Sequence, residues 1–242
     1  MSYIQSFRRY ETKYLITEQQ AEQLLSMAGE LLTPDRYGDY TICNLYLDTE
    51  DFYFIQRSLD KPKYKEKLRL RSYGNADGEQ QVFLEIKKKY RGIVYKRRIT
   101  LPCSEAMDYI MNGTKPPSVN TPITEQIFAE IDFLMQRYKP LPRVYLAYDR
   151  LAFFSRQYPQ LRVTLDNRIR SRWNNIDLAD DSGISYLDTG ISDYRLMEIK
   201  SDGAIPVELA AMLSELKIYP TSFSKYGNIY MNAVRSGKEI LT

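Results

Sequence analysis

The feature that most constrains the fold is an alternation of charged and apolar side chains with a period of two residues. In the segment EKLRLRSY, residues 66–73, the side chains of Lys67, Arg69 and Arg71 share one face of an extended strand, and the intervening leucines share the other. The same period recurs at residues 8–16, 40–48, 65–73, 81–89, 93–101, 143–151, 161–168 and 194–201. The sequence therefore predicts eight β-strands.

The charged faces of these strands carry mostly cations, although the formal net charge of the 242-residue chain is only +3. One interpretation is that they form the solvated side of a half-buried antiparallel sheet. Two cations about 5 Å apart, however, repel by roughly 3 kcal/mol at an effective dielectric constant near 20. Such a concentration of positive charge favours the other interpretation, in which the charged face binds an anion.

Amphipathic helical segments separate the predicted strands, and they need an apolar surface to cover. We expect longer helices within residues 17–32, 121–139, 206–217 and 223–237, and shorter ones at 49–59 and 104–112. Thr17 with Gln20 has the pattern of a capping box, and Pro122 after Thr121 suits a first helical turn. Together the patterns predict an α+β fold: an eight-stranded antiparallel β-barrel (tunnel) with a charged interior, surrounded by α-helices, as one domain over residues 1–242.

Composition excludes several kinds of chemistry. The chain has no histidine, which rules out a phosphohistidine intermediate, a serine–histidine–acid triad and histidine-ligated metal sites. No glycine pattern matches a phosphate-binding P-loop or a GxGxxG motif. Carboxylates, cations, hydroxyls and a hard metal ion are left to carry any reaction.

Cysteine content and hydropathy indicate the expected location. The two cysteines, Cys43 and Cys103, form neither a disulfide framework nor a metal-finger spacing, which suits a reducing compartment. We found no charged-then-apolar leader and no run of about 18 apolar residues. We expect a cytoplasmic protein without a membrane segment in this chain.

Eight short motifs occur in an order that resembles a known family. They are RRYETKYLI, NLYLDT, KLRLRSY, LEIKKKYRGIVYKRRI, YLAYDRLAF, LRVTLDNRI, LMEIKS and SFSKYGN. Together they resemble the triphosphate tunnel metalloenzymes, and in particular the polyphosphate polymerase domain of the vacuolar transporter chaperone (VTC) complex and its bacterial relatives. The first strand holds ETK rather than the Glu-x-Glu-x-Lys of the adenylate-cyclase and thiamine-triphosphatase branch, which favours the VTC-like branch.

The resemblance implies a tunnel in which basic residues bind a linear triphosphate or polyphosphate. Its phosphate-binding positions correspond here to Lys13, Arg69, Arg71, Lys87, Lys96, Arg150, Arg162, Lys200 and Lys225, with Tyr148 and Ser224 as hydroxyl donors. Lys67 and Arg98, which share charged strand faces with these positions, are further substrate-binding candidates. We expect Arg69, Arg71, Lys87, Arg150 and Lys200 to act in catalysis, because phosphoryl transfer depends on holding the phosphates in line and neutralising charge.

A divalent cation is also implied, with Glu198 matching the metal-binding glutamate of the family. Mg²⁺ or Mn²⁺ bridging phosphate oxygens takes one or two carboxylates, so Glu85 or Glu11 is the expected second ligand. The alternative for each acid is an ion pair with a neighbouring lysine. In SFSKYGN, a serine before the last helix would direct backbone N–H groups at a phosphate beside Lys225, whereas the alternative leaves that lysine in solvent.

Three functions remain open from the sequence. The first is a metal-dependent phosphotransferase that makes polyphosphate from ATP, which needs no histidine base because the attacking phosphate is already ionised. The second is a hydrolase of tripolyphosphate or nucleoside triphosphates in the same tunnel. The third is a non-catalytic protein that binds nucleic acid or another polyanion, since Tyr64, Tyr73, Tyr90 and Tyr95 could stack bases. We expect ATP, triphosphate or polyphosphate as ligands and no nucleic acid.

Overall fold

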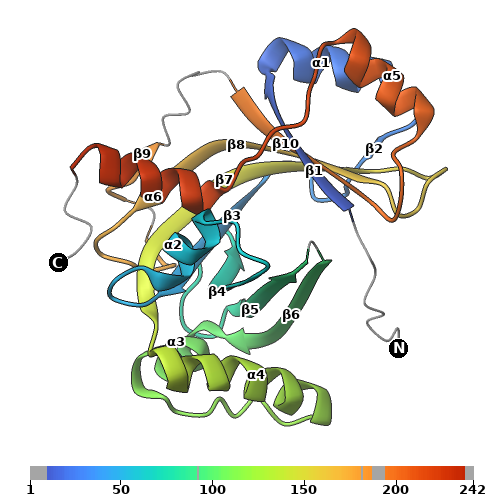
Figure 1. The fold of residues 1–242 in the computed structure, drawn as a ribbon. Coiled ribbons are helices and arrows are strands. Elements are labelled where there is room, and N and C mark those ends of the chain that lie inside the picture. The colour runs from blue at the N-terminus through green and yellow to red at the C-terminus, as the bar shows by residue number, and fades with distance from the viewer. Residues whose placement is uncertain (1–9, 92, 181, 187–193, 238–242) are drawn as a thin grey trace. The chain divides into compact units, whose positions relative to one another are not determined.

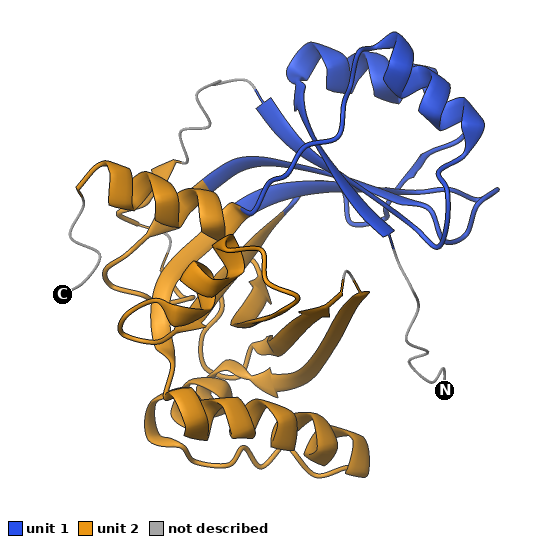
Figure 2. Ribbon diagram, in the orientation of Figure 1, with its two compact units in different colours: residues 1–40, 148–169, 187–224 blue, residues 41–147, 170–186, 225–242 orange. Residues whose placement is uncertain are grey.

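The computed structural model describes residues 10–91, 93–180, 182–186 and 194–237. The chain divides into two compact units (Figure 2). Unit 1, blue in the figure, comprises residues 1–40, 148–169 and 187–224, and unit 2, orange, comprises residues 41–147, 170–186 and 225–242. Each unit is therefore built from segments that are far apart in the sequence.

Unit 1 contains an antiparallel sheet in which β10 lies between β1 and β8. Its elements are β1 (Tyr10–Thr17), α1 (Glu18–Met27), β2 (Thr33–Pro34), β10 (Tyr194–Ser201) and α5 (Val207–Glu215), with residues 148–154 of β7 (Leu141–Phe154) and 162–169 of β8 (Arg162–Arg172). The short strand β2 pairs with the end of β7. The apolar sides of β1, β8 and β10 pack with α1 and α5 into one hydrophobic core.

Unit 2 contains the antiparallel series β3–β4–β5–β6 (Figure 1). Its elements are β3 (Tyr40–Asp48), α2 (Tyr53–Leu59), β4 (Tyr64–Tyr73), β5 (Gln81–Tyr90), β6 (Ile93–Pro102), α3 (Cys103–Asn112), α4 (Pro122–Tyr138), β9 (Ser185–Tyr186) and α6 (Lys225–Arg235), with the remaining parts of β7 and β8. Helices α3 and α4 pack on the apolar face of the strands.

The predicted orientation of the strands is confirmed in both units. In unit 2, Leu68 and Leu70 are 1% and 0% exposed and belong to the core beneath α3 and α4, so the cations of β4 occupy the opposite face. In unit 1, Met197 and Ile199 are buried against α1 and α5 in the same way. The helices cover the aliphatic side of each sheet, as amphipathic packing requires.

Local sequence signals set the helix ends as expected. Thr17 accepts a hydrogen bond from the backbone N–H of Gln20, whose side chain accepts one from the backbone of Thr17, which completes a capping box. Thr121 caps α4, with Pro122 in its first turn. Gly113 ends α3 with a φ of 76°, a backbone conformation that a side chain would strain.

All eight predicted strands occur within a few residues of the expected bounds, although residues 8 and 9 of the first lie outside the described residues. The fold class is α+β, with antiparallel strands and six helices in the described parts of the chain. The pairings among the described strands do not form a closed ring, so the predicted barrel is not confirmed. That residues 1–242 form one domain stays a prediction. In the described part of the chain, every helix is too short or too polar to cross a lipid bilayer.

Candidate functional site

The charged face of unit 2 is organised around one buried carboxylate, Glu85 on β5. Arg69 donates from Nε to Glu85 Oε2 at 2.8 Å, and Arg71 Nε lies 3.7 Å from the same oxygen. Lys96 Nζ lies 2.6 Å from Oε1. Together with Tyr46, these four residues form what we call the Glu85 cluster, in which three cations share one carboxylate that is 1% exposed.

Strand β3 supplies the polar groups that fix the two arginines. Arg71 Nε donates to Asn44 Oδ1 at 3.1 Å, and Asn44 in turn donates to the backbone carbonyl of Leu146 at 3.0 Å. Arg69 Nη1 donates to the hydroxyl oxygen of Tyr46 at 3.1 Å. These bonds follow the strand register, which places Asn44 opposite Arg71 and Tyr46 opposite Arg69.

The mutual fields of these groups shift their pKa values. Burial alone would raise the pKa of Glu85, but Arg69, Arg71 and Lys96 lower it to about 2. Burial and the two neighbouring guanidinium groups lower the pKa of Lys96 to about 8, although Glu85 opposes this change. Glu85 therefore stays ionised at neutral pH, and the charge of Lys96 becomes titratable just above it.

Lysines continue this charged face along the strands. Lys67 on β4 is in register with Lys87 on β5, which is in register with Lys96 on β6. Arg98 lies nearer the other end of β6, and its guanidinium carbon is 4.6 Å from the ring centroid of Phe83. The structure thus brings together on one face of unit 2 all the site residues predicted on β4, β5 and β6.

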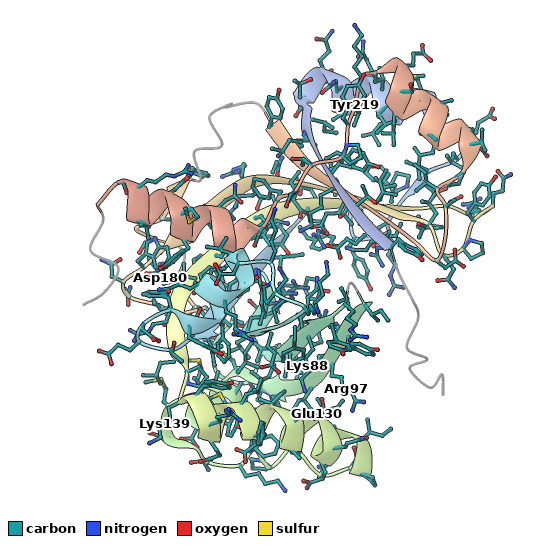
Figure 3. All side chains as sticks on the ribbon, viewed as in Figure 1. Lys88, Arg97, Glu130, Lys139, Asp180 and Tyr219 are labelled. Atoms are coloured by element: carbon teal, nitrogen blue, oxygen red, sulfur yellow. The ribbon has the colours of Figure 1, made fainter. Side chains whose placement is uncertain are left out.

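Cations on the opposite face of the hairpin formed by β5 and β6 have a different environment. Lys88 Nζ lies 3.2 Å from Glu130 Oε2, and Arg97 Nη1 lies 2.7 Å from Glu130 Oε1, so both side chains bind helix α4 (Figure 3). Neither residue is a predicted site residue. They provide matched controls for Lys87 and Arg69.

The charged face of unit 1 is organised around Glu198 on β10, which is 6% exposed. Lys13 Nζ lies 3.5 Å from Glu198 Oε1 and 3.6 Å from Glu11 Oε1, and it donates to the backbone carbonyl of Phe223 at 3.0 Å. Lys200 Nζ donates to Glu198 Oε2 at 3.1 Å. We call Glu11, Lys13, Glu198 and Lys200 the Glu198 cluster, in which two carboxylates converge on one ammonium group.

Two arginines lie on other parts of unit 1. Arg150 donates from Nε and Nη2 to the two carboxylate oxygens of Asp166 at 2.6 and 2.7 Å, and Asp166 is fully buried. Burial would lower the pKa of Arg150, but Tyr148 and Asp166 raise it, so the guanidinium keeps its charge. Arg162 donates to Asp35 at 3.0 Å, with a side chain that is 52% exposed. The predicted site residues of unit 1 therefore differ in burial: Arg150 binds a fully buried carboxylate, whereas Arg162 is largely exposed.

The predicted serine–lysine pair lies at the start of α6. Ser224 immediately precedes the helix, and Lys225 is its first residue. Lys225 is only 9% exposed, so the alternative of a lysine in free solvent is wrong. A cation buried in the first turn is unfavourable for the helix dipole, which agrees with a role in holding an anion.

The carboxylates differ in how well they fit a divalent cation. Glu85 already neutralises part of the charge of three cations, so it fits the ion-pair alternative. Glu11 and Glu198 converge on the ammonium group of Lys13, and the hydroxyl of Thr164, in register with Glu198, is buried without a hydrogen-bond partner. Within the described residues, no group of three or more carboxylates or thiols could hold a metal alone. The donors of unit 1 therefore fit a hard cation that takes its other ligands from water and substrate.

The site residues predicted from the sequence do not include three residues that contact them. Asn44 and Tyr46 share the charged face of β3, and Asp166 holds Arg150. The alternation of β3 was visible, and it placed Asn44 and Tyr46 on the face opposite Leu45. Uncharged side chains gave no reason to select them before their partners were known.

The fold and the two clusters define an α+β protein in which the strands of each unit present an ionised face opposite a helix-covered face. The family described as VTC domain matches residues 8–233. This chain therefore belongs to the VTC domain family, and the predicted family is confirmed. Comparison with curated proteins gave no match.

Solved structures share the fold at low sequence identity. A candidate adenylate cyclase from Bacillus halodurans is 17% identical, with a TM-score of 0.52, over 90% of this chain and 95% of that chain. A candidate adenylyl cyclase from Hippeastrum, described as having a dominant triphosphatase activity, is 16% identical, with a TM-score of 0.49, over 94% of this chain and 95% of that chain. The first likeness shows the fold alone, and the second is too weak to carry an argument.

Proposed function

We propose that this protein is a metal-dependent phosphotransferase that binds triphosphate or polyphosphate and makes polyphosphate from ATP. The observation that carries the proposal is the Glu85 cluster, where three cations surround a single buried carboxylate. The five groups of this cluster hold two more positive charges than negative ones, and the lysines in register with Lys96 add to that excess. A thin polyanion is the ligand that offsets such a charge.

Side-chain chemistry assigns a role to each kind of cation. The guanidinium groups of Arg69, Arg71 and Arg150 bind phosphate oxygens through two donors at once and fix their direction. Lys87 and Lys200 contribute point charges that neutralise the charge developing on the transferred group. Hydrogen bonds from these arginines to Glu85, Asn44 and Asp166 fix the orientation of the guanidinium groups before the substrate binds.

Glu198 and Glu11 are the proposed ligands of Mg²⁺ or Mn²⁺. When bound, the ion supplies charge neutralisation at phosphate oxygens. Lys13 and Lys200, which contact these carboxylates, would move to phosphate oxygens as the acids turn to the cation. The chain's own part is to present two carboxylates on the adjacent strands β1 and β10, whose register places Glu11 opposite Lys200 and Glu198 opposite Lys13.

The proposed step transfers the γ-phosphoryl group of ATP. A terminal oxygen of the acceptor phosphate forms the new P–O bond, the bond to the β,γ-bridging oxygen breaks, and ADP leaves with that electron pair. The attacking oxygen is already ionised at neutral pH, so no base is needed. Glu85, with a pKa of about 2, is a poor proton acceptor, which supports transfer over the activation of water.

Product analysis tests the proposal directly. The protein is incubated with Mn²⁺ and ATP, and ADP, free phosphate and long-chain product are separated. ADP with polymer is the expected result. ADP with free phosphate alone would replace the transferase with a hydrolase, and unchanged ATP would overturn both enzymatic functions.

A binding measurement separates these functions from nucleic-acid binding. Tripolyphosphate at about a hundred times its dissociation constant should add roughly 2.7 kcal/mol to the free energy of unfolding. We expect a thermal shift with tripolyphosphate that exceeds the shift with an oligonucleotide of equal charge. A shift with the oligonucleotide alone would favour a nucleic-acid-binding protein, whose affinity falls steeply with salt.

A further inference from the structure

Tyr46 is the one uncharged member of the Glu85 cluster, and its ring is fixed. It stacks on the ring of Tyr226 with centroids 4.7 Å apart and an interplanar angle of 27°. Tyr226 is itself held, because its hydroxyl donates to Asp48 Oδ2 at 2.9 Å. Tyr46 is 7% exposed, so its hydroxyl has a defined position beside Arg69.

The hydroxyl of Tyr46 acts as an acceptor in its hydrogen bond, and its capacity to donate is not used. Arg69 Nη1 is the donor in that bond, and the phenolic oxygen is the acceptor. A phenol also carries one O–H group to donate. Among the described residues, no acceptor is found for that hydrogen. A nearly buried donor without an acceptor is costly, which indicates that a ligand supplies one.

The surroundings of Tyr46 show which acceptor fits. Burial would raise the pKa of Tyr46, but Arg69, Lys67 and Arg71 lower it to about 8. The potential at this hydroxyl is therefore strongly positive. An anionic oxygen suits that potential, and the same oxygen can accept from the guanidinium of Arg69, which also binds Glu85.

We propose that the Tyr46 hydroxyl donates a hydrogen bond to a phosphate oxygen that Arg69 also binds, which makes Tyr46 a substrate-binding residue. This inference rests on the proposed function, because it assumes a phosphate chain on the charged face of unit 2. It gives the phenolic O–H of Tyr46 an acceptor and explains why a tyrosine lies among the cations of this face. Its aromatic ring supplies rigidity, and its hydroxyl supplies the contact.

The first test compares Tyr46→Phe with the unmodified protein by calorimetric titration of tripolyphosphate at about pH 7. The substitution keeps the ring and its stacking on Tyr226, and removes only the hydroxyl. Because hydrogen bonds to charged groups are strong, we expect the dissociation constant to rise about 10-fold or more. Equal affinities of the two proteins would overturn the inference.

A matched control separates binding from stability. Tyr109 is also a buried tyrosine of unit 2, and its hydroxyl donates to Asp132 at 2.9 Å on the side covered by α3 and α4. Tyr109→Phe should lower the melting temperature and leave tripolyphosphate affinity within about twofold, because this hydroxyl is remote from the charged face. An equal loss of affinity in both variants would mean that the weaker binding of Tyr46→Phe results from lower stability, which would overturn the inference.

A spectroscopic test follows the phenol of Tyr46 directly in the unmodified protein. Above about pH 8 the phenol of Tyr46 loses its proton, and a phosphate oxygen beside it should restore that proton. Adding tripolyphosphate at about pH 8.5 should therefore lower the near-ultraviolet absorbance of tyrosinate. The groups that act on Tyr46 are Lys67, Arg69 and Arg71 from β4 and Tyr226 from α6. Glu85 from β5 and Lys96 from β6 interact with Arg69 and Arg71.

Of these groups, Lys96 also titrates near pH 8, but its deprotonation does not alter tyrosinate absorbance. The pKa of Tyr226 is raised well above its usual value, so Tyr226 stays protonated. A loss of absorbance in the unmodified protein that is absent in Tyr46→Phe is the expected result. Unchanged absorbance despite calorimetric binding would overturn the Tyr46 inference alone, and no binding by the unmodified protein would overturn the proposed function as well.

Discussion

The two charge clusters are built alike but differ in charge balance: the Glu85 cluster has an excess of cations, whereas acids and cations are equal in number in the Glu198 cluster. Both lie on the strand face opposite a helix-covered core, and both centre on a nearly buried glutamate. In the Glu85 cluster three cations share one carboxylate, whereas in the Glu198 cluster two carboxylates share Lys13. The same alternation of side chains therefore produces one face suited to an anion and another suited to a cation held between acids.

Removing the central carboxylate of the Glu85 cluster should have the largest effect. Glu85→Gln leaves Arg69, Arg71 and Lys96 facing one another with no negative charge among the five cluster residues. We expect a loss of roughly 3–5 kcal/mol in the free energy of unfolding, measured by urea denaturation. Tripolyphosphate should restore more stability to the variant than to the unmodified protein. A variant that is as stable as the unmodified protein would contradict the role of Glu85 as the centre of this cluster.

Acid should weaken the same cluster. The pKa of Glu85 is lowered from 4.5 to about 2, so its stabilising contribution is complete above pH 4.5 and is lost as the pH falls towards 2. The difference amounts to about 3 kcal/mol. Denaturation curves over this range should show a smaller pH dependence in Glu85→Gln. Equal slopes for the two proteins would place the acid sensitivity elsewhere.

Truncating an arginine on each side of the strands tests whether only the charged face of unit 2 takes part in catalysis. Arg69→Ala should lower the rate of ADP formation about 100-fold, because it removes a fixed donor to the phosphates. Arg97→Ala removes the same kind of side chain from the helix-facing side, where Arg97 binds Glu130. Its rate should stay within about twofold of the unmodified protein. Comparable losses in both variants would break the distinction between the two faces.

Neutralising the acids of the Glu198 cluster tests whether that face holds a cation. Glu198→Gln should raise the Mn²⁺ concentration for half-maximal activity by about 10- to 100-fold, and Glu11→Gln should raise it by less. Direct Mn²⁺ titration by calorimetry measures the same change without turnover. An unchanged Mn²⁺ requirement in Glu198→Gln would leave this cluster as an ion-pair network only.

The smallest effect is expected on the helix-facing side of the hairpin. Lys88→Met breaks an ion pair with Glu130 whose two side chains are 27% and 29% exposed. A partly exposed ion pair of this kind contributes little, about 1 kcal/mol or less. Thermal unfolding should change little, and tripolyphosphate affinity should be unaltered, whereas Lys87→Met should weaken it. A weaker affinity in Lys88→Met would show that both faces contact phosphate.

Strand bounds and strand orientation could be predicted because both depend on local alternation. The predictions for β3 and β10 match the observed residues, and the predicted leucines do lie under helices. The two-residue strands β2 and β9 were missed, since a period cannot be detected over two residues. Local patterns also hold no information on how distant segments group, so the division into two units could not be anticipated.

The charged residues of the candidate site could be predicted from the sequence, but the side chains that pair with them were harder to predict. Arg69 and Glu85 lie on strands joined by a short connection, and their pairing follows from the register of that hairpin. Arg150 and Asp166 also lie on consecutive neighbouring strands, β7 and β8, but their bidentate bond depends on side-chain conformations that the alternation pattern does not specify. Tyr46 carries no formal charge, so only its position beside Arg69 shows its importance.

The register of β1 with β10 has a consequence for how the protein is made. It places Lys13 on β1 opposite Glu198 on β10, and the other strands lie between these two in the sequence. During synthesis, β4, β5 and β6 can pair soon after they leave the ribosome, because they follow one another in the chain. Strand β1 must instead wait until β10 has emerged. The pair of carboxylates proposed for the cation therefore forms later in synthesis than the Glu85 cluster.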